Sequence, residues 1–225
     1  MYPRVKKVVY DNRIELTESF FTENYALEID REKCIACGFC IRACPNGVFS
    51  SPDIIGMVRV KTDDLKPEVP DITKCSFCGT CVYICPLTAI KLKKNGKDIN
   101  LDTMGIVAHH VVPKLNHETV QSKKTQDKIK KHFIGKICVN WDKCVSCMSC
   151  VDVCPVNAFI RNKNKSKEDP KSKKVQFTEE KCIGCGTCAR ACNAEAITYN
   201  LSGLNFSGEF KAIFWNSLIE RIRTK

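Results

Sequence analysis

Short stretches in which apolar and polar residues alternate recur along the chain and predict several small β-strands. A period of two residues is typical of a strand that buries one face. The stretches lie at residues 27–29, 89–92, 137–139, 175–177 and 196–199. They sit next to cysteine-rich segments, and together these segments and strands favour small α+β units.

The carboxyl end shows a helical pattern instead. Apolar residues at 210, 213, 214, 218 and 222 would share one face of a helix. This amphipathic tail has two interpretations: it covers the protein's own surface, or it docks on a larger enzyme. The amino-terminal residues 1–25, with Phe20, Phe21 and Tyr25, allow the same two roles.

Composition adds cysteine and charge to this picture. The 225 residues include 17 cysteines and carry a formal net charge of +11. No run of 18 apolar residues predicts a membrane-spanning helix, and the amino terminus lacks the apolar core of a secretion signal. We therefore expect a cytoplasmic protein without membrane insertion, in a reducing compartment where thiols serve metals or redox chemistry rather than disulfides.

Sixteen of the cysteines form four groups with one spacing, C-x2-C-x2-C-x3-C. Proline follows three of the groups, at Pro45, Pro86 and Pro155. Zinc sites usually separate two C-x2-C pairs by a dozen or more residues, so this crowded spacing argues against zinc. The groups are Cys34, Cys37, Cys40 and Cys44; Cys75, Cys78, Cys81 and Cys85; Cys144, Cys147, Cys150 and Cys154; and Cys182, Cys185, Cys188 and Cys192.

These four motifs resemble those of the bacterial-type ferredoxin family, and the chain is similar to a polyferredoxin. The first reads Cys34-Ile-Ala-Cys37-Gly-Phe-Cys40-Ile-Arg-Ala-Cys44-Pro, and the other three follow it closely. The overall layout, with Val-Val-Pro-Lys at 111–114, is similar to the polyferredoxin subunits of archaeal formylmethanofuran dehydrogenases. The resemblance implies four [4Fe-4S] clusters, in which the fourth cysteine of a motif binds the cluster of a partner motif.

Two pairings of the motifs are open: adjacent, one with two and three with four, or nested, one with four and two with three. The long gap between Cys85 and Cys144 favours the adjacent pairing. Under that pairing, the resemblance assigns cluster 1 to Cys34, Cys37, Cys40 and Cys85; cluster 2 to Cys75, Cys78, Cys81 and Cys44; cluster 3 to Cys144, Cys147, Cys150 and Cys192; and cluster 4 to Cys182, Cys185, Cys188 and Cys154.

The predicted fold class is α+β, with two tandem two-cluster ferredoxin-like modules that each contain pseudo-two-fold βαβ repeats. The modules cover residues 26–94 and 136–200. They are accompanied by an amino-terminal extension (1–25), a linker (95–135) and the amphipathic tail (201–225). In the linker, Val120, Ile129 and Phe133 are spaced too sparsely to support more than one weak helix.

Some candidate residues fall outside the cluster sets. Cys138 is predicted not to be a ligand, because it lies on the polar face of its strand. The histidines at 109, 110, 117 and 132 are expected to be solvated or hydrogen-bonded. Two positions depart from the family pattern, Met148 where the other motifs have glycine and Asn193 where they have proline, and both are expected to tune a cluster rather than remove it.

Charge at first suggests nucleic acid as a partner, because basic residues cluster at 161–174. No nucleic-acid-binding motif accompanies them, so a solvated hairpin tip is expected, with partner docking as the alternative. Sixteen thiolates and four oxidised clusters would lower the net charge to about +3. Much of the positive charge is therefore expected to balance the clusters.

The predicted function is electron transfer, since a cluster held by four cysteines has no open site for a substrate. The chain shows no phosphate-binding loop or dinucleotide fingerprint, and no catalytic site of its own is predicted. The expected partners are the catalytic subunits of a larger oxidoreductase, formylmethanofuran dehydrogenase by the resemblance, in a hetero-oligomer with other redox proteins. The alternatives are a free polyferredoxin carrier and a subunit of a hydrogenase, formate dehydrogenase or other molybdopterin enzyme.

Overall fold

A computed structural model describes residues 3–99, 112–123, 127–162 and 174–224 of the chain. His109, His110, Val111 and most of the basic segment at 161–174 lie outside the described residues. Among the described residues, no helix has both the length and the apolarity needed to cross a bilayer.

The largest element is an antiparallel sheet of five strands in the order β1-β2-β3-β4-β5. Its inner strands alternate in burial, and Leu16, Leu27 and Leu92 point into one core. Residues from the amino-terminal extension thus form a hairpin that continues the sheet of the first two motifs. The strands are β1 (Arg4–Val9), β2 (Arg13–Ser19), β3 (Asn24–Asp30), β4 (Ile90–Lys94) and β5 (Lys97–Asp98).

Three two-stranded antiparallel sheets complete the β-structure of the described residues. One flanks motifs three and four and pairs β8 (Phe133–Val139) with β11 (Ile197–Leu204). A second pairs β9 (Phe159–Arg161) with β10 (Val175–Phe177), and a third pairs β6 (Glu118–Gln121) with β7 (Lys128–Lys131).

The β6–β7 hairpin corrects the expectation of a weak helix in the linker. Val120 pairs directly with Ile129, and Ile129 is fully buried. With one apolar side chain on each strand, a hairpin places both on the same face, with Val120 half-buried beside Ile129. A helix over this segment would present no continuous apolar stripe.

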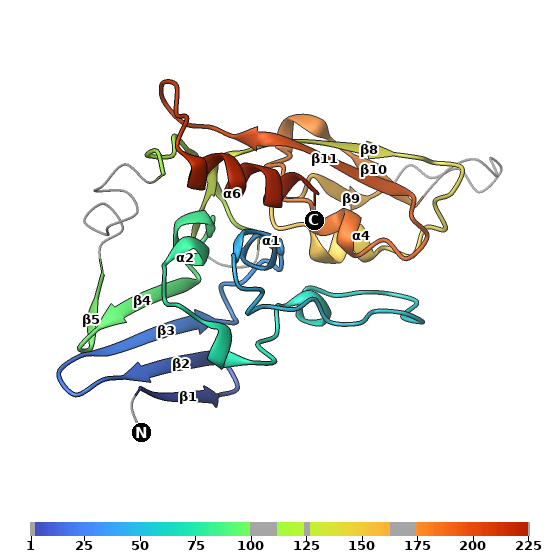
Figure 1. Ribbon diagram of the computed structural model, residues 1–225. Helices are drawn as coiled ribbons and strands as arrows, with labels where there is room; N and C mark the ends of the chain where they lie inside the picture. Colours follow the sequence, from blue (N-terminus) through green and yellow to red (C-terminus); the bar gives the residue numbers. More distant parts are fainter. Residues whose placement is uncertain (1–2, 100–111, 124–126, 163–173, 225) are drawn as a thin grey trace.

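Each motif contains one short helix between its second and fourth cysteines. These helices are α1 (Phe39–Ala43), α2 (Thr80–Ile84), α4 (Ser149–Val153) and α5 (Thr187–Arg190). Single 3₁₀ turns are η1 (Asp63–Leu65), η2 (Ile72–Lys74) and η4 (Glu179–Lys181). Figure 1 shows α1 and α2 between the five-stranded sheet and the sheet of β8 and β11.

The two halves of the chain share buried cores. Ala36, Val60 and Leu65 of the first half pack in one cluster with Met148 and Val153 of the second. Ile35 packs with Ile183 in another. The halves therefore do not stand apart on a flexible connection, and contacts between them shape both.

The carboxyl-terminal helix α6 (Ile213–Thr224) confirms the helical spacing and shows what its apolar face covers. Trp215, Leu218 and Ile222 are buried in a cluster that includes Phe39 of α1 and Tyr83 of α2. This face therefore packs on the protein's own motifs, as the first interpretation of the tail expected.

His132 is buried behind α2. It is 2% exposed, and its Nε2 atom lies 3.1 Å from the carbonyl oxygen of Ile84. Within the described residues, its Nδ1 atom has no hydrogen-bond partner. Burial lowers the pKa of His132 from 6.5 to about 4. The imidazole is thus neutral near pH 7.

The stability of the folded chain should depend on pH through His132. Because the folded-state pKa is depressed, the folded chain resists protonation that the unfolded chain accepts, and stability is lost as the pH falls from 6.5 towards 4. The wild type should lose about 3 kcal/mol more than His132→Gln over this range. Anaerobic denaturant titrations of both cluster-loaded proteins measure the difference, and identical pH profiles would contradict the assignment.

Candidate metal centres

The backbone of each motif is shaped by two residues in the left-handed region. In motif one these are Ala36 and Gly38, with φ of 57° and 77°. The same two positions have positive φ in the other motifs, at Phe77 and Gly79, Ser146 and Met148, and Gly184 and Gly186. Such turns direct successive backbone N–H groups to the concave side of the loop, where they can donate to sulfur.

Amide hydrogen bonds to the thiols are visible in the described residues. The N–H of Val48 donates to Cys44 Sγ at 3.4 Å, and that of Ala158 donates to Cys154 Sγ at 3.2 Å. The N–H of Ala196 donates to Cys192 Sγ at 3.3 Å. In each of these three motifs the donor is the residue four positions after the fourth cysteine. The backbone therefore fixes the position of the fourth thiol in the same way in all three.

The structure gathers the cysteines in sets that combine two neighbouring motifs. Three of these sets each line one cavity, together with apolar residues. The lining cysteines are Cys34, Cys37, Cys40 and Cys85 in the first cavity; Cys44, Cys75, Cys78 and Cys81 in the second; and Cys144, Cys147, Cys150 and Cys192 in the third.

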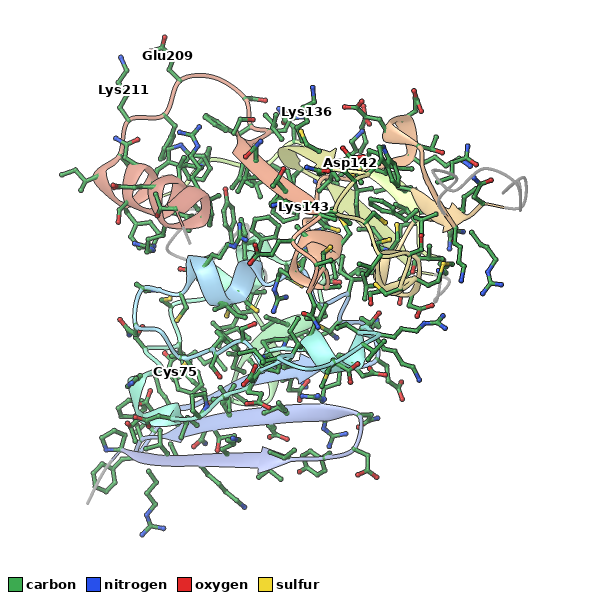
Figure 2. The ribbon with its side chains drawn as sticks, turned by 90° about the vertical axis from the view of Figure 1, so that its right-hand side faces the viewer. Cys75, Lys136, Asp142, Lys143, Glu209 and Lys211 are labelled. Atoms are coloured by element: carbon green, nitrogen blue, oxygen red, sulfur yellow. The ribbon has the colours of Figure 1, made fainter. Side chains whose placement is uncertain are left out.

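The fourth set is brought together in a different way. Cys182, Cys185 and Cys188 lie near Cys154, whose charge raises the pKa of each of the three thiols, after burial as the main cause in every case. The fourth cysteine of a motif therefore lies with the first three of the adjacent motif, and in the first half Cys75 lies beside the five-stranded sheet (Figure 2).

Burial is the largest influence on the pKa of several of these thiols. It raises the pKa of Cys34, Cys75 and Cys185 to about 11 and that of Cys150 to about 12. The charges of neighbouring thiols raise these values further, while amide hydrogen bonds lower several of them. Without a metal these four thiols stay protonated near neutral pH, so binding a cationic centre must release their protons.

In three of the sets the four thiols surround a cavity rather than a point. Among the described residues, no three His, Cys, Asp or Glu side chains converge closely enough to hold a single metal ion. One zinc ion would bring its thiolates to about 2.3 Å from a common centre. A [4Fe-4S] cluster distributes its four thiolates over four irons, which is what a cysteine-lined cavity accommodates.

The remaining sequence candidates lie outside these sets. Cys138 is exposed on β8, opposite Thr198 of β11. Ile35, Val82 and Ile183, each directly after a motif cysteine, are buried, whereas Val151, in the equivalent position, is half-buried.

The two departures from the family pattern both lie where the halves meet. Met148 adopts the left-handed conformation with φ of 74°, which costs a residue with a Cβ atom roughly 1 kcal/mol. Its side chain is buried in the cluster that contains Ala36 and Leu65. The Nδ2 atom of Asn193 donates to the carbonyl oxygens of Ile54, at 3.2 Å, and Met57, at 2.6 Å.

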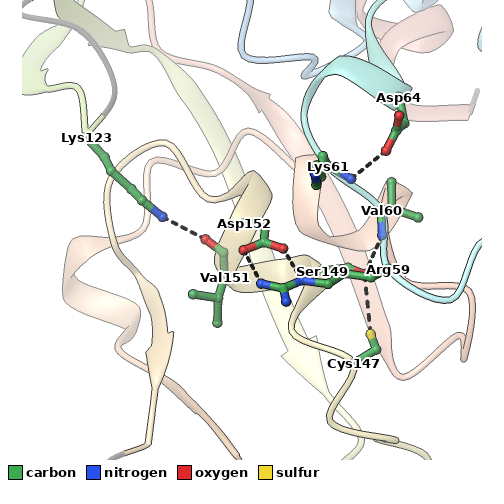
Figure 3. A network of polar contacts seen from close by, with 9 residues as sticks. All are labelled: Arg59, Val60, Lys61, Asp64, Lys123, Cys147, Ser149, Val151 and Asp152. Carbon is green, nitrogen blue, oxygen red and sulfur yellow. Dashed lines mark hydrogen bonds and ion pairs between the residues drawn. The ribbon is translucent and has the colours of Figure 1, made fainter.

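A polar network that the sequence did not predict holds the segment between motifs one and two, residues 45–74, against α4 (Figure 3). The guanidinium of Arg59 forms two hydrogen bonds with the carboxylate of Asp152, at 2.5 and 2.8 Å. The N–H of Val60 donates to Ser149 Oγ at 2.9 Å. Arg59 and Asp152 lie 93 residues apart in the chain, so their opposite charges alone could not pair them.

Comparison with known proteins gives matches in both halves of the chain. Two families described as 4Fe-4S dicluster domain match the chain, one at residues 143–196 and the other at residues 33–90 and 74–160. No curated protein sequence matches it. A chain of the "Formate dehydrogenase - heterodisulfide reductase - formylmethanofuran dehydrogenase complex from Methanospirillum hungatei" has a similar fold, with a TM-score of 0.79 and 21% identity over 100% of this chain and 92% of that chain.

The second family alone matches residues from 33 to 160, which is more than half of the chain. Its two matches overlap at 74–90, so they do not decide how the motifs pair. The four cysteine motifs, their positioned thiols and these matches lead to one conclusion: the chain belongs to the polyferredoxin-like proteins with 4Fe-4S dicluster domains and carries four [4Fe-4S] clusters.

Proposed function

We propose that this chain is the electron-transfer subunit of a larger oxidoreductase and passes single electrons through its four clusters. The observation that carries the proposal is the gathering of cysteines from adjacent motifs around shared cavities. The proposed ligands are Cys34, Cys37, Cys40 and Cys85 for cluster 1; Cys75, Cys78, Cys81 and Cys44 for cluster 2; Cys144, Cys147, Cys150 and Cys192 for cluster 3; and Cys182, Cys185, Cys188 and Cys154 for cluster 4.

When bound, a cluster with four thiolate ligands supplies one-electron redox chemistry. The chain's own residues hold it, donate amide hydrogen bonds to its sulfur ligands and exclude water. Ile35 and Leu87, for example, are buried beside Cys34, Cys37 and Cys85. An apolar, hydrogen-bonded shell of this kind controls solvent access and the local dielectric, and so sets the reduction potential of the centre.

The two-module organisation belongs to this proposal. Strands β3 and β4 bracket motifs one and two and pair with each other, and β8 and β11 do the same for motifs three and four. We assign residues 26–94 and 136–200 to the modules. Packing between the halves makes them one electron-transfer unit.

Formylmethanofuran dehydrogenase is the proposed partner, in a cytoplasmic hetero-oligomer. Support comes from the fold shared with a chain of a complex whose title includes that enzyme. In this arrangement the partner's subunits perform catalysis and this chain connects them to an electron donor or acceptor.

The first test is the iron content of the cluster-loaded chain. Four clusters correspond to about 16 iron atoms per chain. We expect Cys40→Ala to lose cluster 1, with about a quarter of the iron, while Cys138→Ala retains all of it as the matched control. Equal iron loss in both variants, or zinc in place of iron, would overturn the ligand assignment.

The second test concerns the partner. Purified formylmethanofuran dehydrogenase catalytic subunits should bind the cluster-loaded chain in size-exclusion chromatography and reoxidise its dithionite-reduced form. If the chain remains a free monomer and its absorbance does not recover, the free-carrier alternative takes the place of the subunit.

A further inference from the structure

The loop of motif one and the loop of motif four lie against each other. Thr187 Oγ1 donates to the carbonyl oxygen of Ile35 at 3.3 Å, although the residues are 152 positions apart. Cys185 is buried in the same apolar cluster as Ile35, with Cys34, Cys37 and Cys85 at its edge. Cys185 is also close enough to Cys37 for its charge to act on that thiol. The ligands of clusters 1 and 4 thus meet across the boundary between the halves.

An arginine crosses this boundary. Arg190 belongs to α5 of motif four, yet its guanidinium lies against motif one. Nη1 donates to the carbonyl oxygen of Ala36, and Nη2 donates to Ser51 Oγ at 2.9 Å and to the carbonyl oxygen of Leu65 at 3.2 Å. All three partners belong to the first half of the chain.

The first half leaves room for this guanidinium. A Cβ atom on Gly38 would lie 2.9 Å from Arg190 Nη1 and 3.0 Å from Cζ. Glycine at position 38 therefore allows both the left-handed turn and the close approach of the Arg190 guanidinium. Burial lowers the pKa of Arg190, while the charges of Cys37, Cys40 and Cys34 act in the opposite sense. These three thiols are proposed ligands of cluster 1.

Arg190 occupies a position at which the four motifs carry different side chains. It is the second residue between the third and fourth cysteines, where the other motifs carry Arg42, Tyr83 and Asp152. Arg42 faces the opposite way across the same boundary, since its guanidinium lies 5.8 Å from the ring of Tyr199. Tyr199 in turn donates to the carbonyl oxygen of Gly184 in motif four, at 2.5 Å. Asp152, in contrast, is paired with Arg59.

We propose that electrons cross between the halves by a step between clusters 1 and 4, and that Arg190 raises the reduction potential of cluster 1 at this junction. The inference rests on the proposed function. A fixed, half-buried positive charge stabilises the reduced, more negative form of a nearby cluster, and a low local dielectric strengthens the effect. Arg190 is a positioning and tuning residue here, because it is not itself a ligand.

Potentiometric titrations of the cluster-loaded full chain, followed by EPR, test the effect of the charge of Arg190 on the reduction potential of cluster 1. Arg190→Gln should move one titration step to lower potential and leave the iron content unchanged, whereas Arg190→Lys should preserve most of the wild-type value. Arg13→Gln, an exposed arginine on β2, is the matched control and should change no step. Four unchanged steps in Arg190→Gln, or loss of the iron in both Arg190 variants, would overturn the proposal.

Arg59→Gln tests whether the cluster on which Arg190 acts is cluster 1. Arg59 lies close enough to Cys147, a proposed ligand of cluster 3, for the charge of that thiol to act on it, so Arg59→Gln should lower a different titration step from that lowered by Arg190→Gln. In the double variant both steps should shift, each by the amount seen alone. If both substitutions lowered the same step, Arg190 would not act on cluster 1 alone and the proposed junction would be wrong.

The junction itself predicts a kinetic effect. After flash reduction, electrons should redistribute between the halves several-fold more slowly in Arg190→Gln than in Arg13→Gln, because the step through cluster 1 becomes less favourable. An unchanged rate despite a lowered step would place the crossing elsewhere. A wild-type chain that binds no iron would refute the proposed function as well, which separates the two failures.

Discussion

Removal of the iron by an anaerobic chelator should unfold most of the chain. The four motif helices contain only four or five residues each, and helices of this length are not stable in isolation. Three of the sheets have only two strands, which is marginal for an independent sheet. The elements around the motifs therefore depend on the cofactors that join them.

The cores lead to the same expectation. Cys40, Cys44 and Cys81 are themselves buried members of the cluster beneath the five-stranded sheet. Losing a cofactor leaves a cysteine-lined cavity inside that core, which is costly because its lining loses contacts. We expect the near-UV circular dichroism to disappear and most of the far-UV signal to decrease as iron is removed.

The measurement is a chelator titration followed by circular dichroism and iron analysis under anaerobic conditions. Dithionite-reduced protein without chelator is the control, since reduction alone changes the absorbance but should leave the fold intact. An apo-chain that keeps its near-UV spectrum and melts cooperatively at the holo-protein's temperature would contradict the expectation.

The cysteine spacing predicted the iron–sulfur clusters, and the alternating pattern predicted several of the strands. The alternating stretches at 27–29 and 137–139 are strands, and they pair with the strands that follow motifs two and four. Such signals are local: a period of two and a repeated spacing are properties of a few consecutive residues. The gathering of thiols from adjacent motifs then follows from the pairing of these strands.

Contacts between the halves could not be predicted in the same way. Met148 and Asn193 departed from the family pattern at two ligand-flanking positions, and the sequence suggested only that they tune a cluster. The structure gives each a partner in the other half, Ala36 and Leu65 for Met148 and the carbonyl oxygens of Ile54 and Met57 for Asn193. These partners lie between 83 and 139 residues away, where no sequence periodicity connects them. The amino-terminal hairpin was not predicted either, although β2 pairs with β3 close by in the chain, from Arg13 with Asp30 to Ser19 with Asn24.

The helix α6 should contribute strongly to the stability of the cluster-loaded chain through Leu218. This side chain is fully buried, and it packs in the same cluster as Phe39 and Ala43 of α1. Arg42 Nη1 also donates to the carbonyl oxygen of Ile222 at 3.3 Å, so α6 and α1 are joined by polar and apolar contacts. Leu218→Ala should lower the free energy of unfolding by about 3 kcal/mol, through lost burial and the cavity that remains.

Ile213→Ala is the matched control, because Ile213 begins the same helix but is 88% exposed. Its effect should stay within about 0.5 kcal/mol. Anaerobic denaturant titrations measure both variants, and the release of iron to a chelator reports on the motif beneath the helix. Since α1 carries Cys40, Leu218→Ala should also release iron from cluster 1 faster than the wild type. Equal denaturation midpoints for the two variants would show that α6 does not stabilise the motifs on which it packs.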